Sequence, residues 1–377
     1  MLYSRENQRI KTVAFVNDSI GGCFRLCHFT KGTEFMVFFE RDIAIDLGTS
    51  SIIVYVSGKG ITLREPTVVA VDKHSGKLIK VGEDAQKMLG RTPANIVSIH
   101  PIINGVVSDY DMTVRMLKEL IQRITSFSLF NPRIIITVPG SISGVEERAT
   151  IDAGIEAGAR KVYLVEASVA GAVGAGADVG KPDGYMVIDI GGGTTDVGVV
   201  SLGGVVESES IKTAGDAFDE AIVKYIRRKH NLLIGLKTAE ELKIRLGSAY
   251  PVQEPSTEEV KGRCLMTGLP RSVEVNTNDI AEALQEPLIS ILDSVQMVLE
   301  RTPPELVADI SQNGIIMCGG GSLIPGLDRV IFAKTGIRIN PVDDPVTCVA
   351  YGAGKMLDRL ADMEEGMINI ARKRQIK

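Results

Sequence analysis

The 377-residue chain has few of the residues that most often carry catalysis, cross-links or metal sites. Its four histidines are not paired at helical spacing, so histidine catalysis has no support. Its five cysteines are an odd, scattered set without a CxxC motif, which fits reduced thiols better than a disulfide framework. Cys23, Cys27 and His28 would make only half of a metal site, and structural zinc generally takes four ligands, so incidental residues are the better interpretation.

Long apolar runs and a strong positive charge are also missing. No stretch of about 18 uninterrupted apolar residues occurs, so no segment is expected to span a bilayer. The net charge of −5 makes a general nucleic-acid binder improbable. With 44% hydrophobic residues the chain can bury a large core, and its length predicts two or three structural units. We therefore expect a soluble cytoplasmic protein, in which the small-residue segment 162–179 is a strand followed by a tightly packed helix.

Two acidic, glycine-containing turns are the most informative feature. Each lies between two apolar runs, which predicts a strand–turn–strand hairpin. Glycine lets the backbone approach a phosphate, Thr and Ser hydroxyls add donors, and an Asp at the end of the incoming strand suits a hydrated Mg²⁺. The pair predicts one nucleotide held from two sides, with Asp46 and Asp189 acting on Mg²⁺ through water. The turns read Asp46-Leu47-Gly48-Thr49-Ser50-Ser51 and Asp189-Ile190-Gly191-Gly192-Gly193-Thr194-Thr195-Asp196.

A third glycine turn follows the apolar run 314–318. It reads Gly319-Gly320-Gly321-Ser322 and precedes a predicted helix with Leu327, Val330 and Ile331 on one face. This loop is expected to hold the adenosine side of the ligand through its backbone. No GxxxxGK[ST] motif occurs, and no GxGxxG opens a helix after a strand, so the site is neither a P-loop nor a Rossmann fingerprint.

The order of these three turns resembles that of the actin/Hsp70/sugar-kinase ATPase superfamily, and the chain is most similar to the MreB family of bacterial actin homologues. The resemblance runs from about Arg41 to about Leu360 and includes dispersed stretches at 58–61, 64–66, 90–93, 105–110, 158–160 and 302–306. It implies an α/β, actin-like ATPase fold, in which two duplicated α/β halves flank a nucleotide cleft and each carries a smaller inserted subdomain.

The alternation of apolar patterns predicts how the chain is divided. Residues 1–35 are interpreted as a non-native upstream extension or a disordered arm, with Met36 as the true initiator. The first half is placed at 36–180 with an insert at about 67–109, the second at 181–345 with a helical insert at about 213–270, and a closing helix and basic tail at 346–377. Strands are expected at 43–47, 51–56, 134–138, 162–166, 185–190, 195–200, 204–211 and 314–318.

Two predicted helices of the second insert are assigned to the nucleotide. Thr238-Ala239-Glu240-Glu241 matches a capping box that would start a helix through Leu246. By resemblance, Glu240, Glu241, Leu242 and Lys243 border the adenine and ribose, whereas the alternative makes them a capped surface helix. Gly215 and Asp216 open another helix, whose N-terminal amides are expected to face the nucleotide.

The sequence departs from the family pattern where the attacking water is oriented. MreB proteins usually carry Glu-Glu-Pro here, and the second Glu is associated with that water, but this chain has Glu166-Ala167-Ser168. Loss of such a group commonly lowers a rate by about 10²–10⁴. Glu166 is expected to point elsewhere because adjacent strand residues face opposite sides. Asp196, where many relatives have Glu, and Thr194 remain as candidate catalytic residues. Ser51 replaces the usual Asn, and we expect weak ATPase activity at most.

Membrane contact is also implied by the resemblance. In MreB the loop that corresponds to 125–132 presents an apolar pair to the bilayer, so Leu129 and Phe130 are the candidates, with burial in the core as the alternative. Phe38 and Phe39 would add a second apolar contact, because stable peripheral binding takes two weak anchors. The basic tail at 372–377 is either attracted to anionic lipid or simply solvated.

The resemblance implies a cytoskeletal protein that polymerises with itself into protofilaments. Such a protein directs cell shape by organising cell-wall synthesis with transmembrane proteins of the elongation machinery, at the inner face of the cell membrane and without nucleic acid. The alternatives are a hydrolysis-deficient paralogue that copolymerises with an active one, and a monomeric ATPase. An Hsp70-type chaperone would need a substrate domain beyond the ATPase, and a sugar kinase would need a catalytic Asp beside a polar pocket; neither is found in the sequence.

Overall fold

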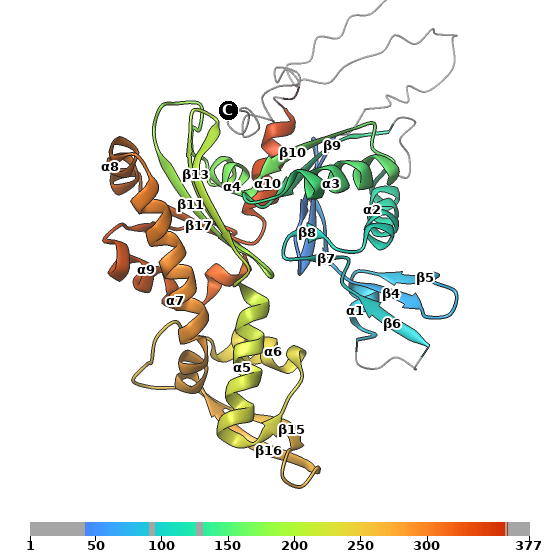
Figure 1. Ribbon diagram of the computed structural model, residues 1–377, viewed down its shortest axis with the longest axis vertical. Helices are drawn as coiled ribbons and strands as arrows, with labels where there is room; N and C mark the ends of the chain where they lie inside the picture. The colour runs from blue at the N-terminus through green and yellow to red at the C-terminus, as the bar shows by residue number, and fades with distance from the viewer. Residues whose placement is uncertain (1–41, 90–94, 126–130, 359, 361–377) are drawn as a thin grey trace, which may run out of the picture.

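Two five-stranded sheets with the same strand order form the centre of the molecule in a computed structural model, which describes residues 42–89, 95–125, 131–358 and 360 (Figure 1). In each sheet, two successive hairpins join three antiparallel strands. Two further strands then extend the sheet in parallel from the first of these three. The first sheet has the order β10-β9-β1-β2-β3, and the second has the order β13-β12-β11-β17-β18. The repeated plan confirms the predicted duplicated α/β architecture.

The predicted strands agree with the observed ones to within one residue at each end. The first sheet contains β1 (Ile43–Leu47), β2 (Ser51–Val56), β3 (Gly60–Pro66), β9 (Arg133–Val138) and β10 (Lys161–Glu166). The second contains β11 (Tyr185–Ile190), β12 (Thr195–Ser201), β13 (Gly204–Ile211), β17 (Ile315–Cys318) and β18 (Ile339–Asn340).

The first sheet is covered on both faces, which explains its continuous apolar runs. Ile134 and Ile136 pack in a core with α2 (Tyr110–Thr125) and α3 (Gly144–Glu156). The intervening Ile135 points the other way, into a core with α4 (Ala167–Gly174) and α10 (Cys348–Leu357). That second core also contains Val187 and Ile316 of the second sheet, so α4 and α10 lie between the two halves (Figure 1).

An insert extends from each half at the same end of the molecule (Figure 1). The first contains a three-stranded sheet, a short helix and a small hairpin: β4 (Val69–Asp72), β5 (Leu78–Val81), α1 (Glu83–Gln86), β6 (Ile96–Ile99), β7 (Ile102–Ile103) and β8 (Val106–Val107). The second contains α5 (Gly215–His230), β14 (Leu232–Leu233), α6 (Leu236–Leu246), β15 (Thr257–Cys264) and β16 (Pro270–Asn276).

Two predictions for the second insert are wrong. It is not purely helical, because β14, β15 and β16 form a sheet; β15 was missed because most of its side chains are charged or polar and only Val260 and Cys264 are buried. Thr238 does not cap α6, which begins at Leu236 after Gly235 and has no side-chain cap. The remaining helices are α7 (Thr277–Arg301), α8 (Pro304–Asn313), the 3₁₀ turn η1 (Gly320–Leu323) and α9 (Leu327–Thr335).

Glycines allow α4 and α10 to cross with their backbones in contact. A Cβ added to Gly352 would overlap the Ala170 carbonyl oxygen, and one added to Gly174 would overlap that of Cys348. Only glycine permits this approach, which places the two halves on a shared helix pair. Within the described part of the chain, no helix is long and apolar enough to cross a membrane.

We predict that Gly352→Ala lowers the free energy of unfolding by about 1–3 kcal/mol, because the added methyl group forces the crossing apart. Gly144→Ala is the matched control: it lies at the exposed start of α3 with nothing within 4 Å of an added Cβ, so it should stabilise the protein by at most about 1 kcal/mol. Chemical denaturation measures both. Equal stability of wild type and Gly352→Ala would contradict the close crossing.

Candidate functional site

The two predicted acidic-glycine turns meet each other across the two halves. A Cβ added to Gly192 would overlap Ser50 Oγ, and one added to Gly193 would lie 2.5 Å from Thr49 Oγ1. Ser50 Oγ also donates to Asp216 Oδ1 at 3.4 Å, which links the first turn to the start of α5. Segments about 140 residues apart in the sequence therefore lie in contact, as one shared nucleotide site would require.

The first turn is held by hydrogen bonds from outside the motif. The Gly48 amide donates to the Ser51 carbonyl at 3.1 Å, which closes the hairpin between β1 and β2. Thr67 Oγ1 donates to the Gly48 carbonyl at 2.7 Å, and the Gly105 amide donates to Thr49 Oγ1 at 2.8 Å. The turn is thus fixed against the first insert, and its Thr and Ser hydroxyls face the second turn.

The second turn is joined to α5 by its backbone. The Gly191 amide donates to the Thr194 carbonyl at 2.9 Å. The amides of Gly215 and Asp216 donate to the carbonyls of Gly191 and Gly192 at 3.1 and 2.8 Å. These two amides were expected to face a nucleotide, but they donate to carbonyls of the second turn instead. What Gly215 and Asp216 contribute to the site is the position of α5 beside that turn and the carboxylate of Asp216.

The third glycine turn lies directly beside the second. Strand pairing places Cys318 opposite Asp189, so the chain enters Gly319 next to the end of β11. Gly319 has φ +82°, and an added Cβ would lie 2.6 Å from Asp189 Oδ1, so only glycine fits there. Gly320 has nothing within 4 Å of an added Cβ, whereas a Cβ on Gly321 would overlap Ile190. The Ser322 hydroxyl donates to the Gly319 carbonyl at 2.6 Å and stays within the loop.

Three aspartates lie close together next to these turns: Asp46, Asp189 and Asp196. Burial raises the pKa of Asp46 to about 6, against the hydrogen bond that Thr137 Oγ1 donates at 2.6 Å, and nearby Asp196 adds to the rise. Burial raises the pKa of Asp189 well above its usual value, and the charges of Asp46 and Asp196 raise it further. A divalent cation or its waters would relieve this like-charge repulsion, so the residues fit the predicted Mg²⁺ role.

Glu166 lies near Asp196 and adds a fourth carboxyl group to this acidic cluster. Asp196 is 5% exposed and accepts from the Gly140 amide at 3.1 Å. An added Cβ on Gly140 would lie 3.4 Å from Glu166 Oε2, which is buried and has no hydrogen-bond partner among the described residues. Burial, then the charges of Asp196 and Glu147, raises the pKa of Glu166 to about 7.

The expectation that Glu166 points away from this region is therefore wrong. The alternation of side chains holds only inside a strand, and β10 ends at Glu166 while α4 begins at Ala167. Glu166 occupies the N-cap position of α4, so its side chain is directed by the strand-to-helix junction. Ala167 is buried at the first position of α4 and carries no group that can hydrogen-bond a water.

The α6 residues that were predicted to border the adenine and ribose lie in three different environments. Lys243 Nζ lies 3.0 Å from the Gly215 carbonyl oxygen and 2.9 Å from Asp219 Oδ1, so it connects α6 to the start of α5 near the site. Glu240 and Glu241 are exposed, and Glu241 pairs with Arg245 at 3.3 Å. Leu242 is 2% exposed and packs in the core of the second half, so its side chain does not line the site here.

Four residues that hold the turns and aspartates lie outside the sequence motifs: Thr67, Gly105, Thr137 and Gly140. Thr137 could have been found, because it is the one polar residue in the apolar run 134–138 and β9 lies next to β1. The other three follow from tertiary contacts that no local pattern encodes. The predicted membrane residues Leu129, Phe130, Phe38 and Phe39, the basic tail and the Cys23–Cys27–His28 cluster lie outside the described residues.

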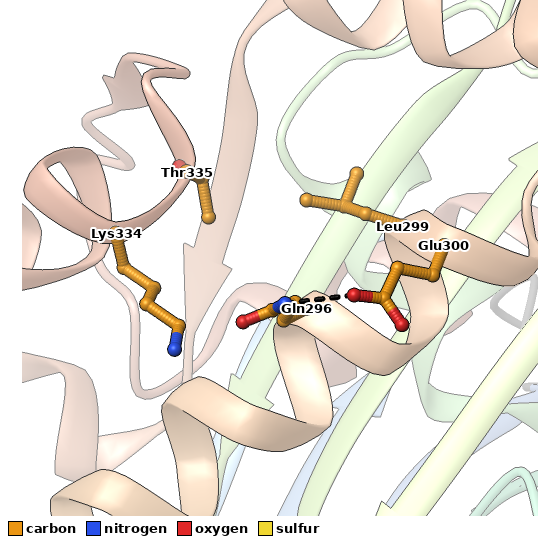
Figure 2. Close-up of a pocket in the computed structure, with 5 residues that line it drawn as sticks. All are labelled: Gln296, Leu299, Glu300, Lys334 and Thr335. Atoms are coloured by element: carbon orange, nitrogen blue, oxygen red, sulfur yellow. Dashed lines mark hydrogen bonds between the residues drawn. The ribbon is translucent and has the colours of Figure 1, made fainter.

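Two surface hollows contain none of the predicted site residues. One, of about 480 Å³, lies between α7 and α9 and is lined by Gln296, Leu299, Glu300, Lys334 and Thr335 (Figure 2). Figure 2 shows Gln296 Nε2 bonded to Glu300 Oε1 at 2.7 Å, with the Lys334 side chain across the hollow. The other, of about 490 Å³, lies between α5 and α7. Both are surface hollows lined mainly by helix residues, and none of the glycine turns contributes to their lining.

Sequence comparison finds close relatives over most of the chain. A family model described as MreB/Mbl protein matches residues 40–365. The cell shape-determining protein MreB of Escherichia coli (strain K12) is 47% identical over 339 residues, which cover 88% of this chain and 97% of the relative. The cell shape-determining protein Mbl of Bacillus subtilis (strain 168) is 46% identical over 323 residues, covering 85% and 97%.

Structural comparison gives the same fold. MreB5 of Spiroplasma citri bound to ADP matches with a TM-score of 0.82 and 34% identity, covering 86% of this chain and 99% of that one. A structure of MreB5 bound to AMPPNP matches equally well, with a TM-score of 0.82. The MamK double helical filament matches with a TM-score of 0.74 over 85% and 99% of the two chains, and at 23% identity it supports the fold alone.

The raised pKa of Glu166 predicts a pH-dependent stability in the ligand-free protein. Folding disfavours its charged form, so stability falls as pH rises from the ordinary value of 4.5 through about 7. Glu166→Gln should therefore raise the melting temperature at pH 8, and the gain should shrink toward pH 5. Asp343→Asn, at an exposed acid, controls for the loss of one surface charge. A gain that is the same at both pH values would contradict the assignment.

Proposed function

Because this chain belongs to the MreB/Mbl family, we propose that it binds ATP with Mg²⁺ between its halves, polymerises with copies of itself and helps to determine cell shape. The relatives named above are cell shape-determining proteins, and MreB5 was crystallised with ADP and with AMPPNP. The observation that carries the nucleotide assignment is the meeting of three glycine turns, two of them from opposite halves, next to the half-buried Asp46 and Asp189 and the buried Asp196.

Each part of the site has a distinct task in this proposal. The amides of residues 49–51 and 192–194, with the Thr and Ser hydroxyls of these turns, donate to phosphate oxygens from the two sides, where glycine leaves room for the backbone. Asp46 and Asp189 orient waters of a bound Mg²⁺, which supplies positive charge to the phosphates. Residues 319–322 approach the adenosine, Asp216 closes the site from α5, and Lys243 closes it from α6. Closure by one ligand fixes the angle between the halves and so favours head-to-tail assembly.

Slow hydrolysis is a second, narrower proposal, and the buried Ala167 favours it. A methyl group cannot orient a water at the position where relatives carry Glu. The carboxylates nearby are Asp196, which the Gly140 amide holds, and Glu166, so any water activation falls to this pair. On this proposal the protein assembles on ATP binding and disassembles late, as a hydrolysis-deficient paralogue that copolymerises with an active one would.

Peripheral membrane binding completes the proposal. Leu129 and Phe130 form one apolar contact, and Phe38 with Phe39 forms the other, which together give the two weak anchors that stable attachment takes. Partners among transmembrane proteins of the elongation machinery are proposed by family resemblance.

We expect Asp46→Ala and Asp189→Ala to weaken Mg-ATP binding by about tenfold to a hundredfold, the effect of losing a charged hydrogen-bonding group. Titration calorimetry measures the affinity, and Asp343→Ala, outside the motifs, is the control. The same two variants should fail to pellet as polymer with ATP. Affinities equal to wild type in both would refute the nucleotide site, and polymer without ATP binding would refute the coupling.

Ala167→Glu should increase phosphate release, because it restores the water-orienting carboxylate. The gain should be part of the about 10²–10⁴ that such a group contributes, since Ser168 replaces the usual Pro at the start of α4. A malachite-green assay under polymerising conditions compares it with wild type and Asp196→Ala. If Asp196→Ala abolishes a substantial wild-type rate and Ala167→Glu adds little, Asp196 already positions the water and the slow-hydrolysis proposal is wrong.

Replacing both Leu129 and Phe130 with Ser should sharply reduce liposome binding while ATP affinity survives. Each large apolar side chain contributes about 1.5–3 kcal/mol when fully buried. Val145→Ser is the matched control, because Val145 is an apolar residue that is 81% exposed on α3. Cosedimentation with liposomes is the measurement. If liposome binding is unchanged, Leu129 and Phe130 are not the membrane anchor. The double variant Phe38→Ser, Phe39→Ser then tests whether those two residues are.

A further inference from the structure

Two cysteines lie together where the halves join. Cys318 ends β17 opposite Asp189, and Cys348 is the first residue of α10. Cys348 Sγ donates to the Gly171 carbonyl oxygen at 3.5 Å, and a Cβ added to the same Gly171 would lie 3.5 Å from Cys318 Sγ. Both sulfurs therefore pack on one residue of α4, and they hydrogen-bond to each other.

The two thiols are electronically unlike. The hydrogen bond with Cys348, together with burial, raises the pKa of Cys318 well above its usual value. The same hydrogen bond lowers the pKa of Cys348. Cys348 is also the first residue of α10, and a helix N-terminus favours the thiolate form, so we expect Cys348 to be oxidised first and Cys318 to resolve the product.

We propose that Cys318 and Cys348 are an oxidation site, where a peroxide converts the two thiols into a disulfide that alters nucleotide binding. The Cys348 thiolate attacks one peroxide oxygen, the O–O bond breaks, and with one proton a sulfenic acid and water result. The Cys318 sulfur then attacks the Cys348 sulfur, the S–S bond forms, and the hydroxyl leaves as water. Two thiols and one hydrogen peroxide give one disulfide and two waters.

The position of the bond explains its effect on the site, an effect that rests on the proposed nucleotide function. A disulfide needs an S–S distance of about 2.0 Å, shorter than any contact between two thiols, so the Cys318 and Cys348 side chains must move toward each other and draw on β17 and α10. Cys318 is followed by Gly319, which has no space for movement against Asp189, and the Gly319 amide donates to the Pro345 carbonyl at 2.8 Å. Any shift is therefore transmitted to the third glycine turn and to the α4–α10 crossing.

Because both sulfurs are buried, we expect the oxidation to depend on whether the junction between the halves is open or closed. Cys318 is 0% exposed and Cys348 is 3% exposed, and Gly174 of α4 packs against the Cys348 backbone. Peroxide reaches the sulfurs only when this junction opens. A ligand that closes the halves should therefore slow the oxidation, which a pair of surface thiols would not show.

The test uses the full chain with Cys23, Cys27 and Cys264 replaced by Ser, so that the pair supplies the only two thiols. Hydrogen peroxide is added with and without Mg-AMPPNP, thiols are counted after denaturation, and peptides are mapped by mass spectrometry. We expect the loss of two thiols per chain, a peptide linking 318 to 348, and slower loss with Mg-AMPPNP. ATP affinity should fall about tenfold, the scale of a strained repacking, and recover with dithiothreitol.

Matched variants and separate readouts make the outcome decisive. Cys348→Ala and Cys318→Ala should each abolish the linked peptide, and the wild-type chain should form it even if a variant folds poorly. The wild-type chain also contains an internal comparison, Cys264, a thiol whose pKa is lowered to about 7 by hydrogen bonds with Thr267. Retention of both thiols while Cys264 is oxidised, or a bond between chains on a non-reducing gel, would overturn the inference, as would a disulfide that leaves ATP affinity unchanged. Absence of ATP binding by the reduced protein would instead overturn the proposed function, and the thiol count would still decide whether the bond forms.

Discussion

The close approach of backbone to backbone at glycine is the constraint on which this structure depends. It operates twice between the halves. At the α4–α10 crossing, Gly174 and Gly352 bring two helices together with no side chain between them. At the turns, Gly192 and Gly193 lie against the hydroxyl side chains of Ser50 and Thr49. The crossing holds the halves together, and the turns form the proposed nucleotide site between them.

The electrostatics of the site follow from that approach. Bringing the turns together also brings Asp46, Asp189 and Asp196 together in a buried setting, which raises the pKa of each of them. Without a cation the closed arrangement carries like-charge repulsion, and with a cation it gains a charged bridge. If Mg²⁺ and nucleotide bind as proposed, relief of this repulsion favours closure of the halves and gives the proposed coupling between ligand and polymer a physical basis.

Local patterns were enough to predict most of the fold and part of the site. The hairpins around Asp46 and Asp189 could be predicted because apolar strands, glycine turns and polar hydroxyls are encoded within a dozen residues. Failures occurred where a tertiary contact, or the boundary between two elements, decides the outcome. Thr238 matches a capping box, but α6 begins two residues earlier, at Leu236 after Gly235. Glu166 was misplaced because a strand-to-helix junction, not strand alternation, directs it. The roles of Thr67 and Gly105 could not be predicted, because their hydrogen bonds to the first turn exist only when the first insert is folded against it.

The central claim is that one nucleotide is held from both halves at once, and hydrogen–deuterium exchange tests it most directly. Exchange of the full chain is compared with and without Mg-AMPPNP at residues 46–51, 189–196 and 319–322, with the surface hairpin of β15 and β16 as the internal reference. The account predicts that all three segments gain protection together at the same ligand concentration, while the reference is unchanged. Protection of only one turn, or of turns at separate concentrations, would contradict it.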